Sequence, residues 1–106
     1  MLSEEQKQRL VAAHELRYSL VALTESFGEQ LDQVDRYIVW DYVDYSEQGL
    51  AFDHLLYRLF DEPVRDITVT PGQADRLHEL GKALGYTTNS SIVYKIFLTQ
   101  HFPDEV

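Results

Sequence analysis

Apolar side chains recur at steps of three or four residues through most of this chain of 106 residues, a spacing that places them on one face of an α-helix. Ser3 and Gln6 have the spacing of a capping box, in which the side chain of each accepts a hydrogen bond from the backbone N–H group of the other. The pattern predicts a first helix that begins at this box and ends at Gly28. Its apolar stripe comprises Ala13, Leu16, Leu20, Leu23 and Phe27.

A second helix is predicted from about Gln30, and its main apolar face is expected to be the buried one. That face comprises Leu31, Val34, Ile38, Tyr42 and Tyr45. The opposite side is not purely polar, because aspartates alternate there with Tyr37, Trp40 and two valines. A helix that is apolar on most sides is usually central in its bundle, which favours burial of Tyr37 and Trp40 in the core. The alternative for these two residues is an exposed place in a binding patch.

A third helix is predicted after Ser46, which can serve as its N-cap. Glu47 would then lie in the first turn, where a carboxylate is favourable against the helix dipole. Pro63 is expected to end this helix, and residues 66–70 alternate polar with apolar side chains, which indicates an extended or loop-like link. The broad buried face of the helix comprises Ala51, Phe52, Leu55, Leu56, Leu59 and Phe60.

Thr70-Pro71-Gly72-Gln73 is a second capping box, with proline at the first helical position, where its missing N–H group costs nothing. It predicts a fourth helix, which Gly85 can close in the left-handed conformation. The apolar stripe of this helix comprises Ala74, Leu77, Leu80 and Leu84.

The tail over residues 89–102 has two interpretations. Ile92 and Val93 are β-branched and favour a strand, whereas Ser90 or Ser91 could cap a last helix. We expect the helix. Four or five helices with short connections and almost no strand signal predict an all-α bundle, with residues 1–106 as a single domain. That fold class names no function.

The charge of the chain indicates a class of partner. Eighteen Asp and Glu against nine Lys and Arg give a net charge of −9 at pH 7. This charge repels phosphate backbones and anionic lipids, so we expect no direct contact with nucleic acid or a membrane, and it accelerates encounter with a basic protein. Acidic composition can also serve solubility alone. The chain has no cysteine, and acids stand where a signal peptide has basic residues, so we expect a cytoplasmic protein.

No pattern of catalytic or metal-binding residues stands out. The chain has four histidines, and no two of them are four residues apart, the spacing that places two imidazoles on one helix face for a metal. They are His14, His54, His78 and His101. We expect no metal, no cofactor and no enzymatic activity. The alternative is a small enzyme that uses His54 with Asp53 or Asp41 as general acid and base.

An acidic surface with aromatic residues in it has the composition of a binding patch, since Tyr and Trp are enriched in interface hot spots. We expect such a patch on the second and third helices. Its main residues are predicted to be Tyr37, Trp40, Asp41, Asp44, Glu47 and Asp53, with Asp61 and Glu62 at its periphery. Glu47 has an alternative role as a partner of the helix dipole alone.

Three stretches together resemble the signature of the MafI-type immunity proteins of bacterial polymorphic toxin systems: "YSEQGLAFDHLLYRLFDE", "ITVT" and "LHELGKALGY". The matching positions are Glu47, Leu50, Ala51, Leu55, Leu59 and Glu62 in the first stretch and Leu77, Leu80, Gly81 and Gly85 in the last. The resemblance covers about residues 35–86. The chain departs from the family at Tyr45, where histidine is common, and at Ser46, where glycine is common.

The resemblance implies that the chain binds and neutralises a cognate toxin domain, often a nuclease, by stoichiometric protein–protein binding. A nuclease has a basic groove for its substrate, which an acidic protein can fill or approach. Inhibition of this kind requires slow dissociation and no catalysis. The alternative is a non-enzymatic adaptor or regulatory module that binds another bacterial protein through the same surface.

Overall fold

The computed structural model describes residues 1–61 and 67–106, so Glu62, Pro63 and Asp66 lie outside the described residues. These residues form helices and no strand, which confirms the all-α prediction. None of the described helices is both long and apolar enough to cross a membrane. The elements are α1 (Glu4–Ser26), η1 (Gly28–Gln30), α2 (Gln33–Asp44), α3 (Gln48–Leu56), η2 (Tyr57–Asp61), α4 (Pro71–Ala83), α5 (Ile92–His101) and η3 (Pro103–Glu105).

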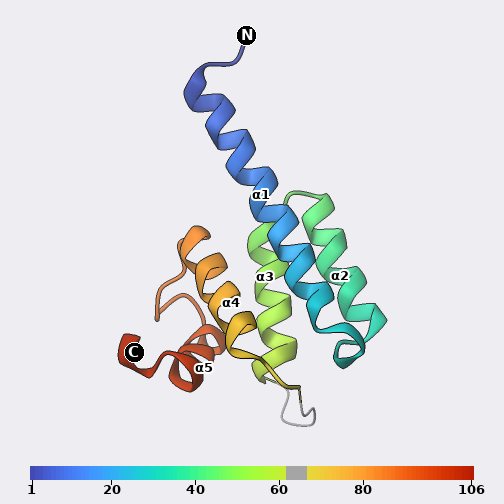
Figure 1. The fold of residues 1–106 in the computed structure, drawn as a ribbon, viewed down its shortest axis with the longest axis vertical. Helices are drawn as coiled ribbons and strands as arrows, with labels where there is room; N and C mark the ends of the chain where they lie inside the picture. Colours follow the sequence, from blue (N-terminus) through green and yellow to red (C-terminus); the bar gives the residue numbers. More distant parts are fainter. Residues whose placement is uncertain (62–66) are drawn as a thin grey trace.

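Helix α2 runs antiparallel to both α1 and α3, and α4 packs against α1 on the side away from α2 (Figure 1). α5 lies across one end of the bundle, where it contacts α3 and η2. The second helix is therefore an outer helix, and the prediction of a central place for it is wrong. The largest fully buried side chains include Leu20 and Leu23 of α1, Phe52, Leu55 and Leu56 of α3, Leu77 of α4 and Phe97 of α5.

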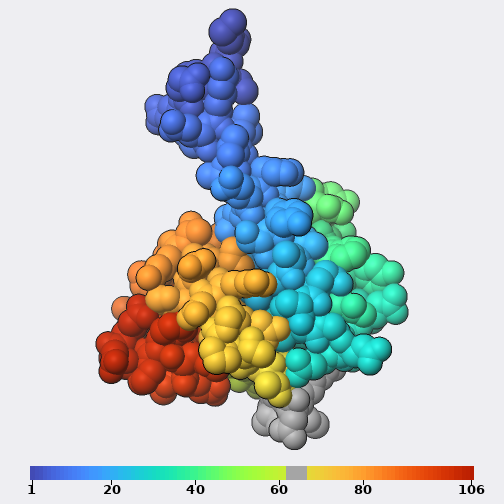
Figure 2. Space-filling view, viewed as in Figure 1, coloured from blue at the N-terminus to red at the C-terminus, as the bar shows by residue number. Residues whose placement is uncertain are grey.

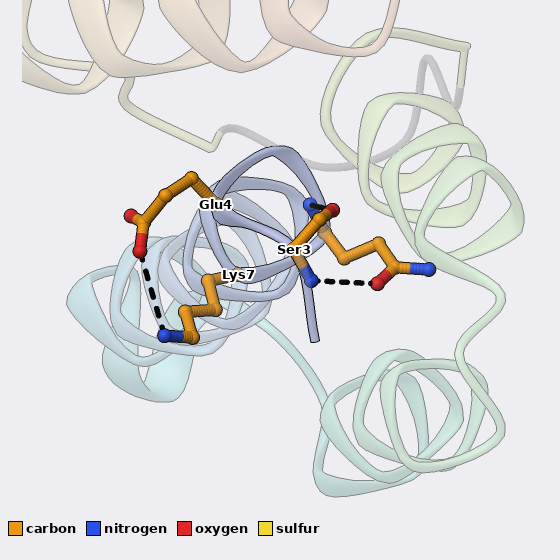
Figure 3. Close-up of polar contacts among 4 residues, drawn as sticks. Ser3, Glu4 and Lys7 are labelled. Atoms are coloured by element: carbon orange, nitrogen blue, oxygen red, sulfur yellow. Dashed lines mark hydrogen bonds and ion pairs between the residues drawn. The ribbon is translucent and has the colours of Figure 1, made fainter. Parts of the chain in front are cut away.

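The start of α1 is the predicted capping box. The Gln6 N–H group donates to Ser3 Oγ over 3.1 Å, and the Ser3 N–H group donates to Gln6 Oε1 over 2.9 Å (Figure 3). Lys7 Nζ lies 3.5 Å from Glu4 Oε1 on the same turn. Every residue from 1 to 15 is exposed, because this half of the helix projects beyond the bundle (Figure 2). The predicted stripe is therefore buried only from its middle onward, and Ala13 is exposed.

The face that α2 turns to the core differs from the predicted one. Val34 and Tyr45 are exposed, and the buried residues of the helix are Asp35, Val39 and Val43. The buried positions follow steps of four from Leu31, which is itself buried. A pattern of apolar residues does not predict this face, because one of its buried residues is an aspartate.

The turn between α2 and α3 also differs from the prediction. Ser46 has a backbone φ of 59°, in the left-handed region, and its N–H group donates to the Val43 carbonyl over 3.0 Å. The Glu47 N–H group donates to the Tyr42 carbonyl over 2.7 Å. These two bonds form a Schellman motif that closes α2. Glu47, one residue before α3, is its N-cap and makes no side-chain capping bond, so the predictions of a Ser46 cap and a first-turn Glu47 are wrong.

The other local predictions that fall on described residues agree with the structure, whereas the predicted helix end at Pro63 lies outside them. On α3 and η2 the predicted face is buried, with Phe60 half-buried at its end. The second capping box caps α4 through the Gln73 N–H group, which donates to Thr70 Oγ1 over 3.1 Å. Gly85 closes α4 with a φ of 79°. The tail is the helix α5, capped by Ser91 Oγ, which accepts from the Tyr94 N–H group over 3.0 Å.

Candidate functional site

A shallow groove of about 400 Å³ runs along the outer face of α2. Its lining residues are Val34, Tyr37, Ile38, Trp40, Asp41 and Asp44. Tyr37 is 57% exposed and Trp40 is 40% exposed, so the preference for burying these two side chains is wrong. The structure thus brings the two aromatic residues and two of the predicted acids together on one open surface.

The position of this groove follows from the buried face of α2. Because Asp35, Val39 and Val43 face the core, the groove residues one or two positions after them point outward. The Tyr37 and Trp40 rings meet edge to face, with centroids 6.2 Å apart and an interplanar angle of 84°. This is a favourable arrangement for two aromatic rings, and it holds both on a rigid helix.

A smaller hollow of about 130 Å³ adjoins the groove, and its lining residues are Glu25, Gln33, Arg36, Tyr37 and Trp40. Arg36 Nη1 lies 3.6 Å from Glu25 Oε2 across the α1–α2 contact. Among the described residues, no acceptor reaches the buried Nε atom of Arg36. The two aromatic rings therefore stand between aspartates on one side and a guanidinium group on the other.

The other predicted acids are not part of the groove. Glu47 is exposed in the turn that follows α2. Asp61 is exposed at the far end of η2, and Glu62 lies outside the described residues. Asp53 accepts a short hydrogen bond from the Tyr86 hydroxyl group and so joins α3 to the segment after α4. Burial raises the pKa of Tyr86, and the hydrogen bond to Asp53 and the charge of its carboxylate raise it further.

The sequence did not predict a buried polar cluster that lies beneath α2. Asp35 is 7% exposed, and its Oδ1 atom lies 3.1 Å from His54 Nε2. Arg58 Nε donates to its Oδ2 atom over 3.0 Å. The carboxylate next to His54 is therefore Asp35 and neither of the acids proposed for it, Asp53 or Asp41. No local signal predicts this cluster, because the partners of Asp35 lie 19 and 23 residues away in the chain.

Two further histidines have structural contacts. His78 Nε2 lies 2.9 Å from Glu105 Oε1, and the His78 ring stacks on Phe102 with centroids 4.2 Å apart. His101 packs against the Phe60 and Phe97 rings. Within the ranges that the structure describes, no three His, Asp or Glu side chains gather as metal ligands would.

Comparisons of the chain with protein-family profiles, with curated proteins and with solved structures found no match.

Proposed function

We propose that this chain binds and neutralises a basic toxin domain, a nuclease in the first instance, through the outer face of α2. The observation that carries the proposal is the groove in which Tyr37 and Trp40 lie exposed beside Asp41 and Asp44. Large aromatic side chains on an open surface are typical anchors of protein interfaces. Acids beside them can pair with the lysines and arginines that a nuclease uses to hold its substrate.

The distribution of charge supports a basic partner for this face. Residues 1–20 contain three acids and three Lys or Arg, so the whole net charge of −9 belongs to residues 21–106. This part of the chain includes α2 and its groove. A concentrated negative field raises the association rate with a positively charged protein. At physiological ionic strength, salt screens this attraction at distances beyond about 8 Å.

The aromatic pair would supply most of the stability of the complex. Both rings sit on a helix and already touch each other, so little conformational freedom remains to be lost on binding. Trp40→Ala should therefore weaken binding by about 30-fold or more, mainly through faster dissociation. Tyr45→Ala is the control, because Tyr45 is an exposed aromatic residue of the same region that lies outside the groove.

The test of function is co-expression with the toxin domain encoded next to the gene of this chain, with growth of the host as the readout. The wild-type chain should restore growth and form a complex with one toxin domain. Binding without restored growth would favour an adaptor or regulatory module instead, and failure of both would contradict the proposal.

The test of the surface is a double charge reversal, Asp41→Lys with Asp44→Lys. The association rate at low salt should fall by at least about tenfold and lose most of its salt dependence. The matched control is Asp75→Lys with Asp104→Lys, which changes the net charge equally at two exposed positions outside the groove. If the control slowed association as much as the test pair, overall charge and not this groove would be responsible.

A further inference from the structure

The N-terminal half of α1 projects from the body of the molecule, and the other described elements leave its residues exposed. Every residue from 1 to 15 is exposed, and the projection is the most prominent feature of the molecular outline (Figure 2). Most of the stability of a protein helix comes from packing of its apolar face against another surface. A projecting helix of this length therefore gains stability from a surface that covers it.

α1 carries a second apolar stripe besides the one that faces the core. Val11, His14, Tyr18 and Val21 follow steps of three, four and three residues, which is the a and d spacing of a coiled coil. Val11 is 56% exposed and Tyr18 is 73% exposed, and Leu10 adds a further exposed side chain next to them. Val21 is partly buried, with one side against the core. The stripe begins on the projecting half of the helix and continues along the half that lies on the body.

This stripe is complementary to itself when a second α1 runs antiparallel to the first. With the pair centred between His14 and Tyr18, Val11 lies opposite Val21 of the second copy. Lys7 lies opposite Glu25 of the second copy in the same register, so opposite charges meet at both ends. The projecting residues 7–15 then cover residues 17–25 of the other chain. Because the pair has two-fold symmetry, each chain makes the same contacts with the other.

The surroundings of the stripe suit a second helix. A groove of about 570 Å³ between α1 and α4 runs beside it, and Tyr18 belongs to both. Small side chains at Ala12, Ser19, Ala22 and Ala83 line that groove and permit close approach of another helix. In Figure 2 the half of α1 that lies on the body is uncovered on the viewed face.

The charge of this segment favours a second copy over a basic partner. Residues 1–20 have no net charge, whereas the rest of the chain has −9. Two copies therefore repel each other least when they meet through this segment, and a basic protein is drawn to the other parts of the surface. We propose that the chain forms an antiparallel homodimer through the Val11, His14, Tyr18 and Val21 stripe of α1.

The first test is the mass in solution, measured by sedimentation equilibrium over a range of micromolar concentrations. The wild-type chain should approach twice its mass of 12.4 kDa. Val11→Asp should return it to the monomer, with an unchanged fold because Val11 is exposed in a single copy. Ile92→Asp is the matched control, since Ile92 is an exposed aliphatic residue on α5, and it should leave the dimer intact. A wild-type monomer at every concentration, or a dimer that Val11→Asp does not weaken, overturns the proposal.

The second test is the register, which disulfide formation can report because the chain has no cysteine. A mixture of Val11→Cys and Val21→Cys chains should form a covalent dimer on oxidation, whereas neither variant should do so alone. Positions 11 and 21 are about 15 Å apart along one helix, so only a second copy can bring them within disulfide distance. A covalent dimer of Val11→Cys alone would indicate parallel helices and would overturn the antiparallel arrangement.

Discussion

At the residue scale, the backbone limits which side chain can stand at Ser46 and at Gly81. Ser46 adopts a left-handed conformation in the turn that separates α2 from α3, with a φ of 59°. Gly81 lies inside α4, where a Cβ atom would come within 2.5 Å of the Tyr94 hydroxyl oxygen. The backbone conformation at Ser46 favours glycine, whereas Gly81 has no room for a larger residue.

Ser46→Gly should stabilise the protein by about 1 kcal/mol, because glycine adopts the left-handed region without the strain that a Cβ atom causes. Urea denaturation followed by circular dichroism measures the difference. Ser46→Ala keeps the Cβ atom and is the control that should bring no gain. A loss of stability in the glycine variant would mean that the serine hydroxyl group matters more than the backbone strain.

Gly81→Ala should destabilise the protein by about 1–3 kcal/mol, the range for overpacking a well-packed core. Tyr94 is 2% exposed and its ring contacts the Phe52, Tyr86 and Phe97 rings, so it cannot move aside freely. Gly49→Ala is the control, because Gly49 also lies in a helix but has open space around its Cα atom. That change should stabilise by up to about 1 kcal/mol through helix propensity. Equal effects in the two thermal melts would contradict the close approach of Tyr94.

At the element scale, the orientation of α2 decides both the core and the candidate site. The helix turns Asp35 inward, where His54 of α3 and Arg58 of η2 meet its carboxylate. The same rotation places Tyr37, Trp40 and the outer aspartates on the surface. The buried ion pair and the exposed groove are therefore two consequences of one rotation about the helix axis.

Asp35→Asn should cost about 3 kcal/mol, because it removes the negative charge from a buried ion pair with Arg58. Asp41→Asn makes the same chemical change on the outer face of the same helix. It should alter the free energy of unfolding by less than about 0.5 kcal/mol. Denaturation of both variants under one condition checks the difference, and a mild effect of Asp35→Asn would mean that the cluster does not hold α2 in place.

At the scale of the whole molecule, charge is distributed unequally between a neutral N-terminal segment and an acidic remainder. The acidic part carries the groove proposed for a basic partner, and the neutral part carries the stripe proposed for a second copy. The two surfaces belong to different faces of the bundle, α2 for one and α1 for the other. One chain could then use both surfaces at the same time.

The two proposed associations should respond to salt in opposite directions. Raising NaCl from about 20 to 150 mM shortens the screening length to about 8 Å, which weakens attraction to a basic toxin domain and also weakens repulsion between two acidic copies. The association rate with the toxin domain should fall, whereas the dimer should become more stable. Stopped-flow and sedimentation measurements follow the two effects separately, and a parallel response would contradict the proposed roles of the two surfaces.

The sequence by itself determined where α1, α4 and α5 begin. The bonds of Ser3 with Gln6, of Thr70 with Gln73 and of Ser91 with Tyr94 each join groups three residues apart, so local chemistry suffices to predict them. The buried face of α3 was also predictable, because its apolar residues form one uninterrupted stripe. Only the tertiary structure decided which face of α2 is buried, because the groups that neutralise Asp35 are 19 and 23 residues away in the chain. Since those partners come from a different helix, no local pattern could show that an aspartate faces the core or that Tyr37 and Trp40 face outward.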